Sequence, residues 1–334
     1  MSSLLVTRPI SGQYSAEMVR TTLPALWAAA AIVTLAGACG SPAPAPNPPV
    51  ETPKAEAPAD PYIAEVTKFR NDREATLKAN TGWLTIAGLW FLTQPQTTFG
   101  SDPLNDIVFP PSAPPRAGTF ELRNGKVTVK AAEGVTFQLD GKPVQTKELN
   151  SDVPGPADRL SLGKELQFWV HNSGDRLSIR LRDQNSSLRK TFTGLTWFPI
   201  DPAYRVEATY TPFDKPKIVD VASLVGDSDK TPIPGLVKFT LNGHEYALEP
   251  FAEPDDPRFW FVFRDLTSQT ETYPAARFLY APAPVDGKMV LDFNKAENPP
   301  CAYNPYTTCP LPTEQNRLRT RIEAGERYGG NKEQ

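Results

Sequence analysis

The polar side chains that could form a binding or catalytic site gather in the last quarter of the sequence, on expected strand ends and loops. Asp292 and Asn294 stand two residues apart in an expected strand, and side chains alternate along a strand, so both would face one side. Two such oxygen-bearing groups could orient a sugar or a water molecule, or accept hydrogen bonds from Arg277. A structural hydrogen-bond network is the alternative. The candidate ligand-binding residues are Tyr273, Arg277, Asp292, Asn294, Asn298, Tyr303 and Asn316.

A loop rich in proline, here called the proline loop (residues 298–312), directly follows that strand. Proline fixes φ and lacks a backbone donor, so this segment is predicted to be neither a helix nor a central strand. It is too constrained to wander, and we expect it to fold back over the same sheet end. One concavity would then be lined by Arg277, Asp292, Asn294, Asn298 and Tyr303.

Residues 1–38 are typical of a signal peptide. Arg20 supplies a positive charge ahead of the apolar run 23–36, which is too short for a comfortable membrane span. The small residues leading into Cys39 resemble the bacterial lipobox, and this resemblance implies cleavage before Cys39 and lipidation of its sulfur. A plain signal peptide is the alternative, and Met18 is a second possible start.

Residues 39–61 are rich in Pro, Ala and Glu, a composition that cannot bury a core and favours extended polyproline conformations. We interpret them as a semi-rigid tether between the lipid and a single β-rich domain, residues 62–330. Gly40 follows the candidate lipidated cysteine. An aspartate at this position would indicate retention in the inner membrane, and the sequence has none there. By analogy with Gram-negative lipoproteins, we expect a lipid-anchored envelope protein, in the outer membrane rather than the inner.

If Cys39 carries lipid, Cys301 and Cys309 remain as an even pair in an oxidising compartment, and a disulfide between them is predicted. Closing so short a loop would stabilise the fold by roughly 2–3 kcal/mol. Free buried thiols or metal ligands are the alternatives, although the spacing is no zinc motif.

Charge and motifs narrow the function classes. The net charge is −3 and no Lys/Arg tract occurs, so we expect no nucleic-acid partner. The sequence contains no phosphate loop, dinucleotide fingerprint or HExxH motif, and we expect no cofactor and no metal. A Ser-His-Asp triad would have to use His171 or His244, and no Gly-x-Ser-x-Gly elbow exists, which argues against a serine hydrolase.

Many short alternating segments predict a mainly β fold, a β-sandwich or barrel-like structure with an N-terminal helix and a short C-terminal helix. Residues 62–80 have the helical spacing. The clearest hairpin spans residues 236–248 around Asn242-Gly243.

Three arginines share one face of a predicted strand, with apolar residues on the other face: Arg176, Arg180 and Arg182. Such a row is typical of a solvated surface. Facing a cleft, it would suit an anion.

A series of motifs resembles the uncharacterised bacterial and archaeal family called domain of unknown function 1684. The resemblance covers roughly residues 62–328, and its longest motif is the proline loop. It implies no activity, because none is established for the family. Its other motifs are Gly82-Trp83-Leu84, residues 180–183, Trp197-Phe198-Pro199, residues 263–267, residues 271–273, residues 277–279, residues 291–294, residues 316–318 and residues 323–326. Residues 139–144 and 158–163 faintly resemble a forkhead-associated β-sandwich, in topology alone.

We therefore expect an envelope lipoprotein that binds a small or carbohydrate-like ligand. An envelope hydrolase is the alternative, using Asp292, Glu323 or Glu326 with Arg277 and Tyr273. A structural envelope protein without a ligand is the third interpretation. A deep pocket that brings two carboxyl groups within catalytic reach would favour the enzyme, and a shallow aromatic groove would favour binding.

Overall fold

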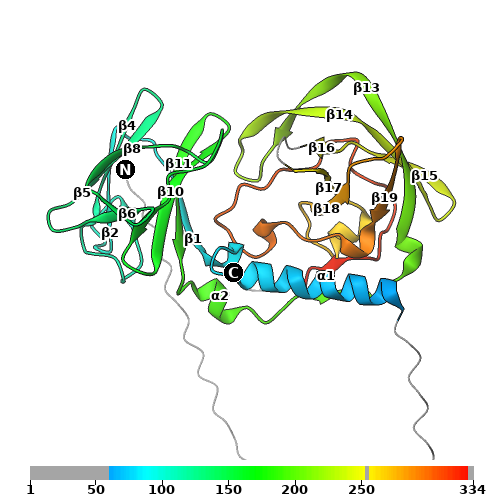
Figure 1. Ribbon diagram of the computed structural model, residues 1–334, viewed down its shortest axis with the longest axis horizontal. Helices are drawn as coiled ribbons and strands as arrows, with labels where there is room; N and C mark the ends of the chain where they lie inside the picture. The colour runs from blue at the N-terminus through cyan, green and yellow to red at the C-terminus, as the bar shows by residue number, and fades with distance from the viewer. Residues whose placement is uncertain (1–59, 253–255, 330–334) are drawn as a thin grey trace, which may run out of the picture. The chain divides into compact units, whose positions relative to one another are not determined.

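The computed structural model describes residues 60–252 and 256–329, which are mainly β with several sheets and an N-terminal helix (Figure 1). The predicted signal peptide, Cys39 and the tether up to residue 59 lie outside the described residues. No helix within the described ranges combines the length and the apolar character that crossing a bilayer requires.

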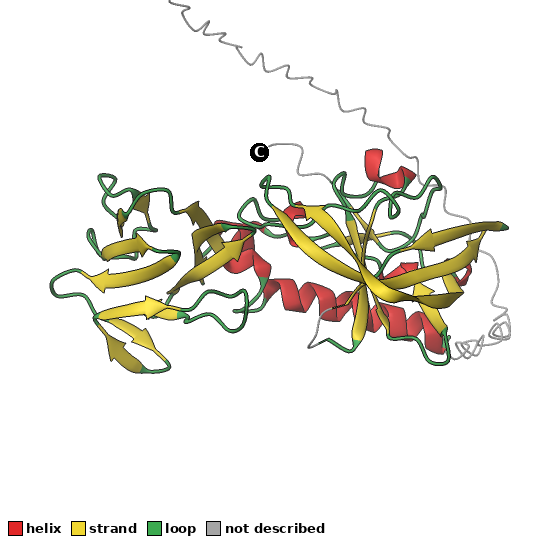
Figure 2. Ribbon diagram, turned by 90° about the horizontal axis from the view of Figure 1, so that it is seen from above, coloured by secondary structure: helices red, strands yellow, loops and turns green. Residues whose placement is uncertain are grey.

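Helix α1 (Pro61–Lys78) matches the predicted helix closely. Asp60 caps its start, because the Asp60 side chain accepts a hydrogen bond of 2.9 Å from the Tyr62 N–H. Pro61 occupies the first turn, where no backbone donor is needed. Figure 2 shows α1 as the long helix among the strands. The Tyr62 hydroxyl donates to Asp292 Oδ1 at 2.9 Å, which ties the start of the helix to residues far along the chain.

Residues 86–183 form two sheets, with strand orders β1-β11-β10-β9-β6-β7 and β3-β2-β4-β5-β8. All neighbouring strands are antiparallel except the pair β2 and β3, which is parallel. The strands are β1 (Ile86–Phe91), β2 (Gln96–Gly100), β3 (Ile107–Val108), β4 (Gly118–Arg123), β5 (Lys126–Ala131), β6 (Phe137–Leu139), β7 (Lys142–Val144), β8 (Thr146–Leu149), β9 (Leu160–Leu162), β10 (Leu166–Ser173) and β11 (Arg176–Asp183).

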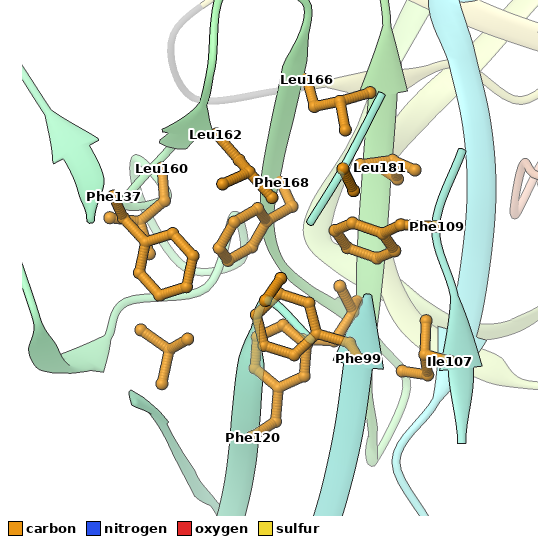
Figure 3. Packing of buried hydrophobic residues seen from close by; sticks show 14 of the residues in the cluster. Phe99, Ile107, Phe109, Phe120, Phe137, Leu160, Leu162, Leu166, Phe168 and Leu181 are labelled. Carbon is orange, nitrogen blue, oxygen red and sulfur yellow. The ribbon is translucent and has the colours of Figure 1, made fainter. Parts of the chain in front are cut away.

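These two sheets share one hydrophobic core, the first core, with phenylalanines at its centre (Figure 3). The Phe99 ring stacks on Phe120 with centroids 4.2 Å apart, and it meets Phe168 of the other sheet edge-on at 5.5 Å. Fully buried aromatic side chains contribute a large hydrophobic free energy. The first half of the described chain is therefore sandwich-like.

The second half begins with the short helix α2 (Ser187–Thr191) and forms sheets of order β15-β14-β13-β19, β16-β17-β18 and β12-β20. Its buried apolar residues form two further clusters. The strands are β12 (Thr196–Trp197), β13 (Arg205–Ala222), β14 (Ser228–Leu241), β15 (His244–Leu248), β16 (Phe251–Ala252), β17 (Arg258–Phe263), β18 (Arg277–Pro282), β19 (Lys288–Asp292) and β20 (Glu326–Arg327).

The hairpin of β14 and β15 has the predicted turn. Asn242 and Gly243 adopt φ angles of 52° and 78°, and Leu241 pairs with His244 across the turn. Positive φ at both central residues is what a two-residue hairpin requires, and Asn-Gly supplies it cheaply.

Asn294 does not lie in a strand, so the prediction that Asp292 and Asn294 alternate onto one strand face is wrong. Strand β19 ends at Asp292, and residues 293–295 form a 3₁₀ turn. The Asp292 carboxylate caps this turn by accepting from the Asn294 N–H at 3.1 Å. An N-terminal cap of this kind competes with strand continuation.

The short C-terminal helix is also absent from the described residues, where residues 303–329 contain no helix. Residues 316–320 of this segment instead run beside residues 264–266, which come directly after β17. The Leu318 N–H donates to Arg264 O, and the Leu266 N–H donates to Thr320 O, both at 2.8 Å. Backbone groups satisfied by a neighbouring strand have no need of helical partners.

The solvated-surface interpretation of the arginine row is wrong for two of its members. Arg180 is 4% exposed and Arg182 is 8% exposed, whereas the Arg176 side chain is 42% exposed. Residues just after α1 cover this face of β11. Arg182 donates to Thr81 O at 2.8 Å and to Thr85 Oγ1 at 2.9 Å.

Candidate functional site

Arg277 belongs to a buried network rather than to a pocket. The side chain is 0% exposed and donates to Asp265 Oδ1 at 3.4 Å, to Ile322 O at 3.0 Å and to Ala324 O. Its guanidinium carbon lies 5.2 Å from the centroid of the Phe263 ring. Arg277 thus holds the C-terminal segment onto β18.

Asp292 and Asn294 do come together, but around the start of α1. Asn294 Nδ2 donates to the Tyr62 hydroxyl and to Asp201 O, both at 2.8 Å, and Asn294 Oδ1 accepts from the Asp201 N–H at 3.0 Å. Asn294 is completely buried. A saturated, buried amide of this kind is expected in a structural network.

Asn298 forms a third network with Glu326. Its N–H and its Nδ2 donate to the two Glu326 oxygens, each at 3.1 Å, and Nδ2 also reaches the Tyr303 hydroxyl at 3.4 Å. The Tyr273 N–H donates to Asn298 Oδ1 at 3.3 Å. Tyr303 is half-buried and lines a pocket of about 150 Å³ with Phe192 and other residues.

Asn316 lies in a separate buried cluster. Its side chain accepts from the Glu249 N–H at 2.8 Å and donates to Glu249 O and Val262 O, both at 2.9 Å. The structure therefore distributes the sequence candidates over several separate networks, in which Arg277 Nε and Asp292 Oδ2 are the buried candidate atoms without a hydrogen-bond partner among the described residues. It does not place them as walls of one concavity.

Cys301 and Cys309 lie side by side as thiols. The Cys301 N–H donates to Cys309 Sγ at 3.3 Å. The neighbouring thiol lowers the pKa of Cys309. A disulfide between the two residues remains a prediction, and their proximity is compatible with it.

A second pocket, which was not predicted from the sequence, is lined in part by the proline loop. This aromatic pocket has a volume of about 260 Å³. Aromatic walls, one ion pair and part of the proline loop surround it. Its lining residues are Arg73, Trp83, Trp260, Phe278, Tyr280, Glu297, Pro300, Thr307, Thr308, Cys309 and Pro310.

Strands β17 and β18 position the main wall of the aromatic pocket. Trp260 pairs with Tyr280 across the two strands, and their rings stack at 6.1 Å with an interplanar angle of 5°. Phe278 meets Trp260 edge-on at 4.9 Å. Trp260 Nε1 is buried and finds no acceptor among the described residues, and such an unpaired donor is costly to bury.

An ion pair supplies the polar side of the pocket. Glu297 is fixed by reciprocal backbone hydrogen bonds of 2.8 Å with Phe278. Arg73 of α1 lies with its Nε 3.2 Å from Glu297 Oε2 and 3.8 Å from Glu326 Oε2. Burial raises the pKa of Glu297, although the positive charges of Arg73 and Arg258 partly offset this. Burial likewise raises the pKa of Glu326 to about 8.

A second polar group adjoins the pocket at Thr308. His171 Nε2 lies 3.0 Å from Thr308 Oγ1, and His171 Nδ1 lies 2.9 Å from Asp152 Oδ2. No spacing in the sequence connects His171 to Thr308, because the two residues are 137 positions apart. The arginine row was the available signal, since Arg180 of that row lies 3.7 Å from Asp152. In the described part of the chain, no group of three or more His, Cys, Asp and Glu side chains is placed to hold a metal ion.

The fold and its networks define a β-rich protein whose polar motifs fasten the C-terminal segment, helix α1 and the proline loop to the rest of the chain. The model of a family described as protein of unknown function (DUF1684) matches residues 190–327, and the chain belongs to this family. The match is narrower than the range expected from the motifs, and it leaves out α1 and the two sheets around the first core.

Two solved structures are similar to parts of the chain. An uncharacterized protein of Haloarcula marismortui, solved by solution NMR, is 35% identical over 44% of this chain and 81% of that chain, with a TM-score of 0.37. The N-terminal FHA domain from EssC, a component of the bacterial Type VII secretion apparatus, is 16% identical over 30% of this chain and 48% of that chain, with a TM-score of 0.23. No curated protein matches the chain.

The raised pKa of Glu326 predicts a dependence of stability on pH. The folded protein holds a proton on Glu326 that the unfolded chain releases, because the pKa rises from 4.5 to about 8 on folding. This contribution to stability is complete below pH 4.5 and is lost as the pH rises through 8. The free energy of unfolding should fall by up to about 1.4 kcal/mol per pH unit in this window.

Glu326→Gln should flatten that fall in urea unfolding measured from pH 5 to pH 9. Glu323→Gln is the matched control, since the Glu323 side chain is 49% exposed. Parallel pH profiles for the wild type and Glu326→Gln would contradict the assignment.

The cysteine pair gives a second prediction. Export should oxidise Cys301 and Cys309, and mass mapping of non-reduced peptides from the exported protein should show them linked. Two freely alkylated thiols in that protein would rule the disulfide out.

Proposed function

We propose that this protein is an envelope lipoprotein whose folded part binds a small, carbohydrate-like ligand in the aromatic pocket. The observation that carries the proposal is the composition of the pocket. It combines the flat walls of Trp260, Tyr280 and Trp83 with one buried ion pair. Small-ligand sites are typically apolar concavities with a few convergent polar groups.

The size and chemistry of the pocket favour a single ring with hydroxyl groups. Its volume of about 260 Å³ is close to the lower end of small-ligand sites, roughly 300 Å³. Aromatic faces suit the apolar face of a ring. Arg73 offers donors, and Glu297, with its raised pKa, can donate when protonated and accept when ionised. The free Trp260 Nε1 would gain an acceptor from a hydroxyl group.

The hydrolase alternative has weaker support at the residues expected to perform it. Glu326 is 0% exposed and bonded to Asn298, so it has no face toward the aromatic pocket. Glu323 is exposed and pairs with Arg321 at 2.8 Å. Asp292 caps the 3₁₀ turn beside α1. Glu297 is therefore the carboxyl group that a pocket ligand would meet.

The binding proposal predicts a loss of affinity when the pocket carboxyl group is neutralised. A thermal-shift screen of cell-wall fragments and simple sugars should yield a ligand that stabilises the wild type. Glu297→Gln keeps the side-chain shape and should weaken that ligand about tenfold, equivalent to about 1.4 kcal/mol. Isothermal titration would measure the change.

Glu323→Gln again serves as the matched control and should bind normally. An additional readout is tryptophan fluorescence. The signal that Trp260 contributes is the difference between the wild type and Trp260→Phe. A screen without any stabilising sugar, or a ligand that binds Glu297→Gln unchanged, would count against the proposal.

If a lipid on Cys39 anchors the protein, replacing Cys39 should change the cell fraction in which the protein is found. Cys39→Ala should move the protein from the membrane fraction to the soluble fraction and abolish fatty-acid labelling. Cys301→Ala, which leaves the lipobox intact, is the control and should still be labelled. Unchanged labelling of Cys39→Ala would disprove the anchor.

A further inference from the structure

Asp152, His171 and Thr308 form a continuous hydrogen-bonded series at the edge of the aromatic pocket. His171 Nδ1 contacts both Asp152 oxygens, at 3.0 and 2.9 Å, and His171 Nε2 lies 3.0 Å from Thr308 Oγ1. His171 is 7% exposed, whereas Thr308 is half-buried and lines the pocket. The hydroxyl therefore stands between a shielded imidazole and a ligand space.

The surroundings of Asp152 fix the protonation pattern. Burial alone would raise the pKa of Asp152, but the hydrogen bond and the charge of His171 outweigh it, with smaller contributions from the Asn172 N–H and the charge of Arg180, so the pKa lies below its usual range. The carboxylate also accepts from Trp169 Nε1 at 3.2 Å and from the Asn172 N–H at 3.1 Å. An ionised carboxylate only accepts, so His171 Nδ1 carries the proton. In the neutral ring, Nε2 is then free to accept the Thr308 proton.

Arg180 places a positive charge beside the same hydroxyl. Its Nη2 lies 3.5 Å from Thr308 Oγ1, and its Nη1 lies 3.7 Å from Asp152 Oδ2. Burial lowers the pKa of Arg180 to about 10, which leaves the guanidinium charged at neutral pH. Arg180 Nε is buried and has no acceptor among the described residues. A cation in this position can stabilise a developing oxyanion.

Rigid elements hold the series in place. His171 lies in β10 and pairs with Ser178 of β11, whose Oγ donates to His171 O at 3.1 Å. The loop carrying Thr308 is pinned by Asn304, whose Nδ2 donates to Trp83 O and Ile86 O, both at 2.8 Å. Sites supported by such buried contacts keep their geometry.

We propose that Thr308, His171 and Asp152 act as a nucleophilic relay that hydrolyses small esters at the aromatic pocket. The substrate class, an acylated carbohydrate-like molecule, rests on the proposed function. The relay itself rests on the geometry above. Nucleophile, base and orienting carboxylate within hydrogen-bond reach are what such chemistry requires.

In the first half-reaction, Thr308 Oγ attacks the ester carbonyl carbon and its proton passes to His171 Nε2. The carbonyl oxygen becomes an oxyanion beside Arg180. Collapse of this intermediate breaks the bond to the alcohol, which leaves with the proton from His171, and an acyl ester remains on Thr308. In the second half-reaction, water attacks that ester and gives a proton to His171. The carboxylic acid leaves, and the proton returns to Thr308 Oγ.

The competing explanation is a purely structural role, here called the clamp, in which the same contacts only hold the proline loop against β10. The two roles differ in the reactivity of the hydroxyl. A clamp leaves Thr308 as inert as any threonine, whereas a relay makes it react with electrophiles in a manner that depends on His171.

The test uses the full-length lipoprotein in detergent and a biotinylated fluorophosphonate, followed by peptide mass spectrometry. This probe needs no sugar recognition, so its result is independent of the binding proposal. We expect phosphonylation at Thr308 and hydrolysis of p-nitrophenyl acetate by the wild type. His171→Gln should slow both at least about 100-fold, the lower range for loss of a general base.

Matched variants separate the relay from the clamp. Thr308→Val removes the hydroxyl at constant shape and should abolish both signals, while Thr308→Ser retains the hydroxyl and should keep them. His244→Gln changes the other histidine, which is exposed in β15, and should behave as the wild type. Circular dichroism confirms that each variant is folded.

Three results would overturn the proposal: a folded wild type without label on Thr308, Thr308 labelled equally fast in His171→Gln, or inactive folded Thr308→Ser. A labelled Thr308 in a protein that binds no sugar would overturn the binding proposal alone.

Discussion

The structure depends on how a proline-rich segment satisfies its buried polar groups. The proline loop contains five prolines, each of which lacks a backbone donor. Side-chain amides of asparagine residues supply hydrogen-bond donors in place of the missing backbone N–H groups. Asn298 is bonded to Glu326 and Asn304 to the carbonyls of Trp83 and Ile86. These contacts anchor the loop at Asn298 and Asn304, and residues 307–310 of the loop form part of the wall of the aromatic pocket.

Helix α1 adds the charge on which this arrangement relies. Arg73 lies between Glu297 and Glu326 and also donates to Asn298 O at 2.9 Å. Two buried carboxyl groups without a counter-charge would repel each other or remain protonated. Removing one partner from a buried ionic cluster is generally far more costly than the cluster is stabilising. The ion pair of Arg73 and Glu297 thus serves both the aromatic pocket and the packing of α1 against the rest of the chain.

Local chemistry explains which features the sequence could predict. The mainly β fold, helix α1 and the turn at Asn242-Gly243 follow from periodicity, capping and turn preferences, all read within a few residues. The burial and the partners of the polar side chains do not follow from such local preferences. The strand pattern alone predicts that Arg180 and Arg182 are solvated, but residues from outside the strand cover both side chains. The bonds of His171 to Thr308 span 137 positions, and no spacing rule reaches that far.

The buried polar groups of this molecule differ in whether the chain satisfies them. Asn294 and Asn316 have each of their side-chain donors and acceptors engaged with the chain, as buried groups should. Other buried atoms have no hydrogen-bond partner among the described residues, among them Arg277 Nε, Asp292 Oδ2, Arg180 Nε and Trp260 Nε1. Of these four residues, Trp260 lines the aromatic pocket. Leaving such donors unpaired costs stability. An unpaired donor therefore does not by itself mark a ligand site, and Trp260 Nε1 stands out because its side chain also lines a concavity. A hydroxyl or carbonyl oxygen of the proposed ligand would supply the missing acceptor.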